Sequence, residues 1–137
     1  MGSGILRFAP IYGGLLAILI IFLAYRVTTF RRSEKVGITQ SNCSVAMQCA
    51  IRAHANALEN IPLAIVLLVM LELNHLNPLL TNGFGITLVV ARVLHAWGLS
   101  TCENYSFGRF YGTLFTWLAI LGMSILNIWL VAIRYFV

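Results

Sequence analysis

Long runs without a charged residue are the feature that most limits how this chain can fold. No charge occurs from Phe8 to Tyr25 or from Phe110 to Ile133. A helix of about 20 apolar residues is long enough to cross the hydrocarbon core of a bilayer. Only 9% of the 137 residues are charged and 60% are hydrophobic, whereas soluble domains carry about 25% charged residues. The chain is therefore expected to be an all-α integral membrane protein.

The apolar segments predict one membrane domain over residues 1–137, folded as a four-helix bundle with up-down topology. The Asn82-Gly83 pair is interpreted as a helix breaker that delays the start of the third span. The spans are then expected at about 10–28, 43–74, 82–100 and 109–134.

The basic residues predict which side of the membrane each loop occupies. Arg26, Arg31, Arg32 and Lys35 flank the first loop, whereas the second loop carries no formal charge. The positive-inside rule therefore places loops one and three in the cytoplasm and both termini outside. The net charge of +5 is assigned to contact with membrane lipid headgroups. Nucleic-acid binding is excluded, because no basic stripe with interleaved aromatic residues is present.

The cysteines predict neither a disulfide framework nor a metal site. Cys43, Cys49 and Cys102 show no C-x-x-C spacing and no paired Cys/His pattern. An odd cysteine count also argues against a disulfide framework. These residues are interpreted as small apolar side chains within helices.

A strip of polar residues in the second apolar segment is the main functional signal. Arg52, Asn56 and Glu59 are spaced i, i+4 and i+7, so they share one helix face. Arg92 and His95 are three residues apart and share a face of the third span. Ionisable groups within a membrane helix are expensive and suggest a functional site. With Arg109 at the start of the fourth span, the up-down topology should gather these residues at one level in the cytoplasmic half: Arg52, Asn56, Glu59, Arg92, His95 and Arg109.

Such a cluster would bind an anion, because it holds three arginines and one glutamate. Arginine guanidinium groups suit carboxylates and phosphates, and Asn56 can both donate and accept hydrogen bonds. Glu59 could bind an ammonium group or hold an arginine. A ligand with two carboxylates and one amine would fit. The cations would lower the pKa of a thiol in that ligand and make it a nucleophile.

Structural roles would also explain these residues. Arg52 with Glu59, or Arg92 with Glu59, could be ion pairs that lock the helices, and Asn56 could form an interhelical hydrogen bond. His54 is offset from the strip and is interpreted as a packing residue. Two classes of protein therefore compete with an enzyme: a non-catalytic membrane protein that binds an anionic lipid or metabolite, and a structural membrane scaffold.

Outside the cluster, polar and small residues are interpreted structurally. Glu72 and His75 lie about one turn apart at the far end of the second span and are expected to form a solvated interfacial pair. Gly112 and Gly122 are expected to allow close helix approach.

Two motifs resemble those of the MAPEG family, the membrane-associated proteins of eicosanoid and glutathione metabolism. The stretch from Arg52 to Pro62, RAHANALENIP, resembles the second-helix signature of that family, and ARVLHAWGL from Ala91 to Leu99 resembles the third-helix signature. The length and the first motif most resemble the small bacterial inner-membrane branch. The resemblance implies a homotrimer with glutathione bound between subunits near the cytoplasmic face. It also implies a lipophilic second substrate that enters from the bilayer.

The implied activity is that of a microsomal-type glutathione transferase or peroxidase that detoxifies lipophilic electrophiles. No metal is implied, and glutathione serves as co-substrate. By position, Arg109 would stabilise the thiolate as the catalytic residue. The residues that would hold glutathione are Arg52, Asn56, Glu59, Arg92 and His95.

The chain departs from the family pattern at several positions. Ala55 stands where the animal prostaglandin E synthase has another arginine, and Leu99 stands where that enzyme has a tyrosine. Phe110, not serine, follows Arg109. Tyr105 and Tyr111 are candidate substitutes for the missing hydroxyl groups. Fewer glutathione contacts predict weak binding or a different thiol ligand.

Overall fold

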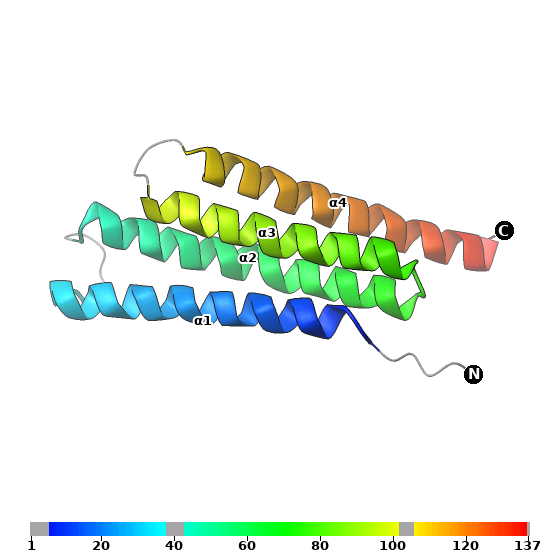
Figure 1. Ribbon diagram of the computed structural model, residues 1–137, viewed down its shortest axis with the longest axis horizontal. Helices are drawn as coiled ribbons and strands as arrows, with labels where there is room; N and C mark the ends of the chain where they lie inside the picture. The colour runs from blue at the N-terminus through cyan, green and yellow to red at the C-terminus, as the bar shows by residue number, and fades with distance from the viewer. Residues whose placement is uncertain (1–5, 38–42, 102–105, 137) are drawn as a thin grey trace.

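The computed structural model describes residues 6–37, 43–101 and 106–136, and these ranges form an all-α, up-down arrangement of long helices (Figure 1). Consecutive helices run in opposite directions, so α1 begins and α4 ends at the same end of the bundle. Cys102, Glu103 and Tyr105 lie outside the described residues. The helices are α1 (Ala9–Glu34), α2 (Val45–Leu73), α3 (Pro78–Thr101) and α4 (Phe107–Phe136).

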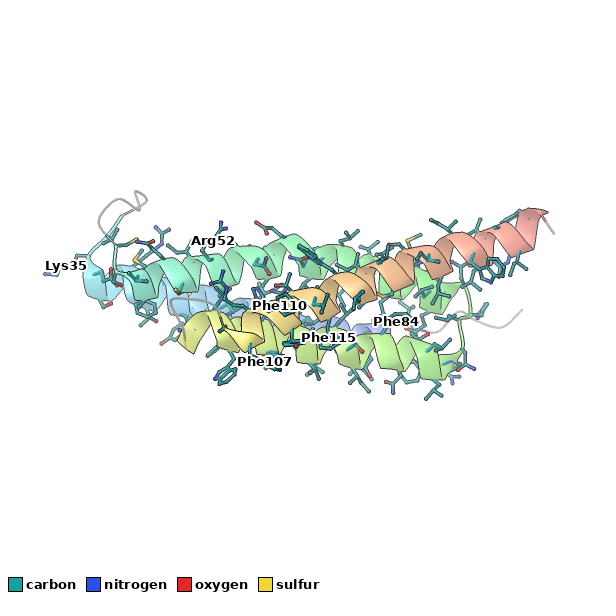
Figure 2. The ribbon with its side chains drawn as sticks, turned by 90° about the horizontal axis from the view of Figure 1, so that it is seen from above. Lys35, Arg52, Phe84, Phe107, Phe110 and Phe115 are labelled. Atoms are coloured by element: carbon teal, nitrogen blue, oxygen red, sulfur yellow. The ribbon has the colours of Figure 1, made fainter. Side chains whose placement is uncertain are left out.

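All four helices are long and apolar enough to cross a membrane. Large apolar side chains cover the outside of the bundle: Ile18 and Phe22 are exposed on α1, while Leu16 and Leu23 on the same helix are buried. Phe107 of α4 likewise points away from the other helices (Figure 2). An apolar exterior around an apolar interior suits a protein surrounded by lipid chains.

Helices α1 and α4 lie on opposite sides of the α2–α3 pair (Figure 1). Helix α2 contacts α1, α3 and α4, and α3 also contacts α1 and α4. Within the described residues α1 and α4 share no contact. The most extensive interface joins α3 and α4, and it forms one wall of the site described below.

Glycines bring the backbones of α3 and α4 together. A Cβ atom built on Gly112 would lie 2.6 Å from the Cβ atom of His95, and one built on Gly108 would lie 2.7 Å from the carbonyl oxygen of Leu94. Real Cβ atoms do not approach this closely. Close approach was predicted for Gly112, whereas the contact between Gly98 and Gly108 has no counterpart in the prediction. Small residues at such positions are typical of packed membrane helices.

The predicted breaker at Asn82-Gly83 is wrong, because α3 already begins at Pro78. The Oδ1 atom of Asn77 accepts a hydrogen bond from the backbone N–H of Leu79 at 2.8 Å, as an N-cap residue does. Proline suits the first helical position because it has no N–H to leave unpaired. Asn82 lies within the helix, and its Oδ1 atom accepts a hydrogen bond from the Tyr12 hydroxyl.

The predicted solvated pair of Glu72 and His75 is also corrected. The Glu72 carboxylate accepts hydrogen bonds from the backbone N–H groups of Arg7, Phe8 and Ala9 at 2.5, 2.8 and 2.8 Å. These groups belong to the first turn of α1 and the residues before it, where N–H groups lack helical partners and the helix dipole favours negative charge. Glu72 therefore caps α1, and His75 adopts a positive φ of 59° just after α2 ends.

At the opposite end of the bundle, a second carboxylate fixes the start of α2. The side chain of Glu34 accepts hydrogen bonds from the backbone N–H and hydroxyl of Ser44, at 2.8 and 2.5 Å. The Ser44 hydroxyl in turn accepts a bond from the backbone N–H of Met47 at 3.1 Å. This arrangement orients the first turns of α2, which carry the predicted polar strip.

Candidate functional site

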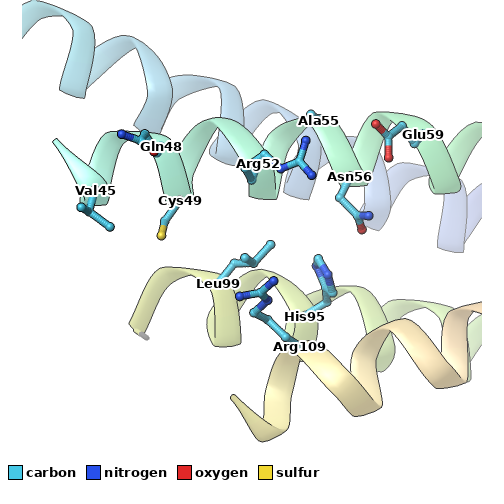
Figure 3. Close-up of a pocket in the computed structure, with 10 residues that line it drawn as sticks. All are labelled: Val45, Gln48, Cys49, Arg52, Ala55, Asn56, Glu59, His95, Leu99 and Arg109. Carbon is cyan, nitrogen blue, oxygen red and sulfur yellow. The ribbon is translucent and has the colours of Figure 1, made fainter. Parts of the chain in front are cut away.

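A polar cavity of about 290 Å³ lies between α2 on one side and α3 and α4 on the other. Asn56 projects from α2 toward Leu99, His95 and Arg109 on the facing helices (Figure 3). Every predicted site residue except Arg92 contributes to the lining. The lining residues are Val45, Gln48, Cys49, Arg52, Ala55, Asn56, Glu59, His95, Leu99 and Arg109.

Among the residues that the structure describes, those lining the cavity carry more positive than negative charge. Arg52 and Arg109 face it together with one carboxylate, Glu59, and all three side chains are exposed in the single chain. The carboxylates of Glu34 and Glu72 are hydrogen-bonded at helix ends elsewhere. An anionic ligand would therefore find guanidinium groups on opposite walls of the cavity, an arrangement that suits carboxylates.

Arg92 lies behind the cavity rather than in it. Its side chain is only 1% exposed. Its Nη2 atom donates a hydrogen bond to Oδ1 of Asn56 at 2.9 Å and lies 3.4 Å from Nδ1 of His95. Its Nε atom has no hydrogen-bond partner among the described residues. Arg92 thus contacts two residues that line the cavity without lining it itself.

The contact with Arg92 fixes the orientation of the Asn56 amide. A guanidinium group only donates hydrogen bonds, so the carbonyl oxygen of Asn56 must face Arg92. The amide nitrogen is then left on the other side, and among the described residues it donates to no partner. The two amide N–H bonds of Asn56 are therefore left for a ligand in the cavity that Asn56 lines.

A second, apolar cavity of about 630 Å³ adjoins the first and shares Asn56, His95 and Arg109 with it. Helix α4 provides the rest of its lining: Phe110, Thr113, Leu114 and Trp117. The sequence analysis did not single out this group as a site. Its i, i+3, i+4, i+7 spacing would have placed it on one face of α4, the face that also carries Arg109.

Tyr111 does not supply a hydroxyl group to either cavity. It packs against Phe107, Phe110 and Phe115, with ring centroids 4.2, 5.2 and 6.1 Å away. Leu99, at the position where a tyrosine was noted as missing, lines the polar cavity as an apolar side chain. Among the residues that the structure describes, Thr113 carries the one hydroxyl group that lines the apolar cavity.

Comparison with known proteins agrees with the motifs. A family model described as the MAPEG family matches residues 9–129. The chain is 33% identical over 121 residues to the inner membrane protein YecN of Escherichia coli strain K12, and the match covers 88% of this chain and 90% of that protein. YecN of Escherichia coli O6:H1 strain CFT073 matches with the same identity and coverage.

Proposed function

Because the chain belongs to the MAPEG family, we propose that it is a glutathione-dependent transferase or peroxidase that acts on lipophilic electrophiles. The observation that carries this proposal is the pair of adjoining cavities, one polar and one apolar, that share Asn56, His95 and Arg109. A reaction between a charged thiol and an apolar electrophile needs two such compartments with a common wall. The names of the YecN relatives give a membrane location and no activity.

The polar cavity would hold glutathione. Arg52 and the Asn56 amide would bind its carboxylates, and Glu59 would bind its ammonium group. His95 would contribute a further polar contact from α3. Arg92 would act through Asn56, by holding the amide with its N–H groups toward the ligand. The guanidinium group of Arg92 is buried, so direct contact with glutathione would require it to move.

Arg109 would stabilise the thiolate, because it lies on the wall that both cavities share. A guanidinium group beside the sulfur favours the charged form of the thiol, and the thiolate is the nucleophile. The attacked carbon would lie in the apolar cavity, among Phe110, Leu114 and Trp117. Holding the two reactants in adjoining compartments would supply the proximity that accelerates the reaction.

We further propose that the site is completed in a homotrimer. The polar cavity lies at the surface of the single chain, where its residues Arg52, Glu59 and Arg109 are exposed. A neighbouring subunit would cover these side chains. The basic residues near the loop between α1 and α2 favour a cytoplasmic location for this end of the bundle, and the relatives favour a bacterial inner membrane.

Calorimetric titration of glutathione into the detergent-solubilised protein would test the proposal. We expect binding that weakens at least about tenfold in an Arg52→Ala variant, since a charge-assisted hydrogen bond contributes about 1.5–3 kcal/mol. The control is Arg134→Ala, which removes an exposed arginine near the opposite end of the bundle and should leave binding unchanged. A folded trimer that binds no glutathione at millimolar concentration would exclude the proposal.

A non-catalytic binding protein is the second candidate, and Leu99 favours it. With an apolar side chain at that position, the polar cavity has one fewer hydroxyl group with which to activate a thiol. Such a protein would bind an anionic lipid or metabolite but would not conjugate glutathione to any electrophile. A structural scaffold differs again, because Arg52→Ala would then dissociate the oligomer instead of weakening ligand binding.

A further inference from the structure

The hydroxyl of Thr113 lacks the backbone hydrogen bond that the other described threonine side chains make. Thr28, Thr29, Thr81, Thr87 and Thr116 each donate a hydroxyl hydrogen bond to the backbone carbonyl four residues earlier, at 2.7–3.3 Å. This bond is the usual one for a threonine inside a helix. Thr113 makes no such bond, and its hydroxyl has no partner among the described residues. The hydroxyl is therefore available to a ligand.

Thr113 lies beside the apolar cavity and close in sequence to the candidate catalytic arginine. Thr113 lines the apolar cavity one helical turn beyond Arg109 on α4, so the two side chains share a face. Its neighbours in the lining from α4 are Phe110, Leu114 and Trp117. Among the residues that line only this cavity, Thr113 supplies a hydroxyl group, and such a donor orients a ligand that carries an acceptor.

We propose that Thr113 is a catalytic residue that donates a hydrogen bond to the oxygen atom of the electrophile, and that the preferred electrophiles are apolar α,β-unsaturated carbonyl compounds. This inference rests on the proposed thiol-transfer function and specifies its substrate class. Arg109 lines both cavities and is assigned to the sulfur, whereas Thr113 lines the apolar cavity alone. Thr113 lies in the compartment that would receive the electrophile.

The reaction is an addition that needs no oxidant or further reactant. The thiolate forms a carbon–sulfur bond at the β-carbon, and the electrons of the carbon–carbon double bond move to give an enolate. The Thr113 hydroxyl donates to the enolate oxygen as its negative charge develops. A proton from water, equivalent to the one that the thiol released, then binds the α-carbon, and the product is a thioether.

The test compares two electrophiles in a Thr113→Val variant, which keeps the shape of the side chain and removes its hydroxyl. With pentyl vinyl ketone we expect kcat/KM to fall at least about tenfold, since a hydrogen bond to a charged group contributes about 1.5–3 kcal/mol. With benzyl chloride, which has no oxygen acceptor, we expect little change. Thr113→Ser should retain the activity with the ketone.

Thr116→Val is the matched control, because the Thr116 hydroxyl already bonds the Gly112 carbonyl at 2.7 Å and should not contact the substrate. An equal loss with both electrophiles in Thr113→Val would overturn the inference, as would unchanged activity with the ketone. If the unaltered protein conjugates neither electrophile while remaining folded, the proposed function itself fails. The two failures are therefore distinguishable.

Discussion

Glu59 lies at the middle of α2 and Glu72 lies in its last turn, and their carboxylates have different surroundings. Glu72 accepts hydrogen bonds from three backbone N–H groups at the start of α1. Glu59 is exposed and faces a cavity that two arginines also line. The carboxylate of Glu72 completes a helix end. The exposed side chains of Arg52 and Glu59 instead face a cavity.

This difference indicates that the hydrogen-bond partners of an ionisable residue in a membrane helix decide whether its role is structural or functional. Burial and charge alone would make Glu72 as strong a functional candidate as Glu59. The hydrogen bonds of Glu72 to α1 explain it without a ligand. Among the described residues no comparable hydrogen bond reaches Glu59, which lines the cavity of the proposed ligand site.

The largest effect is expected for Arg109. Arg109→Leu should lower the rate of glutathione conjugation about 100-fold, as loss of one group that stabilises developing or reactive charge does in other enzymes. Binding of glutathione should weaken less than the rate falls, because Arg109 acts mainly on the sulfur. Stopped-flow absorbance of the thiolate, compared with titration calorimetry, would separate the two. Unaltered thiolate absorbance in the variant would contradict the assigned role.

Glu72→Ala should destabilise the protein and spare the ligand site. Loss of the cap on α1 should lower the free energy of unfolding by about 2 kcal/mol. Thermal unfolding in detergent would measure the loss, and glutathione affinity at a temperature where the variant is folded should be unchanged. Weakened glutathione binding by the folded variant would show that the packing around Glu72 is coupled to the ligand site.

Glu59→Gln should weaken glutathione binding and leave stability unchanged, the reverse of Glu72→Ala. The substitution keeps the size of the side chain and removes its charge, so we expect glutathione affinity to fall about tenfold, or about 1.4 kcal/mol. The unfolding temperature should not decrease. A glutathione analogue without the amino group provides the control, because the substitution should not weaken its binding. Equal weakening for both ligands would argue against contact with the ammonium group.

The smallest effect is expected from the coupling between Arg92 and Asn56. If Arg92 acts only by orienting the amide, then Arg92→Met should weaken glutathione binding in the unaltered chain but not in an Asn56→Ala background. A double-mutant cycle should give a coupling energy of about 1 kcal/mol. Additive effects would indicate that Arg92 contacts the ligand itself.

Local signals in the sequence predicted the helices and the polar strip well. Long uncharged runs define membrane helices, and helical periodicity alone places Arg52, Asn56 and Glu59 on one face. The cap at Asn77 was missed although Asn-Pro is a local helix-start signal, because Asn82-Gly83 was given more weight. The partner of Glu72 could not be predicted, since its hydrogen bonds join residues about one half of the chain apart.

The apolar cavity shows a different limit of sequence reasoning. Phe110, Leu114 and Trp117 have the periodicity of a helix face, but every face of a membrane helix is apolar, so periodicity does not distinguish lipid contact from a site. The missing back-bond of Thr113 is also invisible in the sequence. The cavity depends on how α4 packs against α2 and α3, because Asn56 and His95 also line it.

The glycine contacts between α3 and α4 set how this site can vary. His95 and Arg109 project from backbones that touch each other at Gly98, Gly108 and Gly112. Their spacing is therefore a property of the main chain, and exchanging neighbouring side chains cannot widen or narrow it. If the proposed function holds, differences in substrate preference would arise from the α4 side chains that line the apolar cavity, while the spacing of His95 and Arg109 stays fixed.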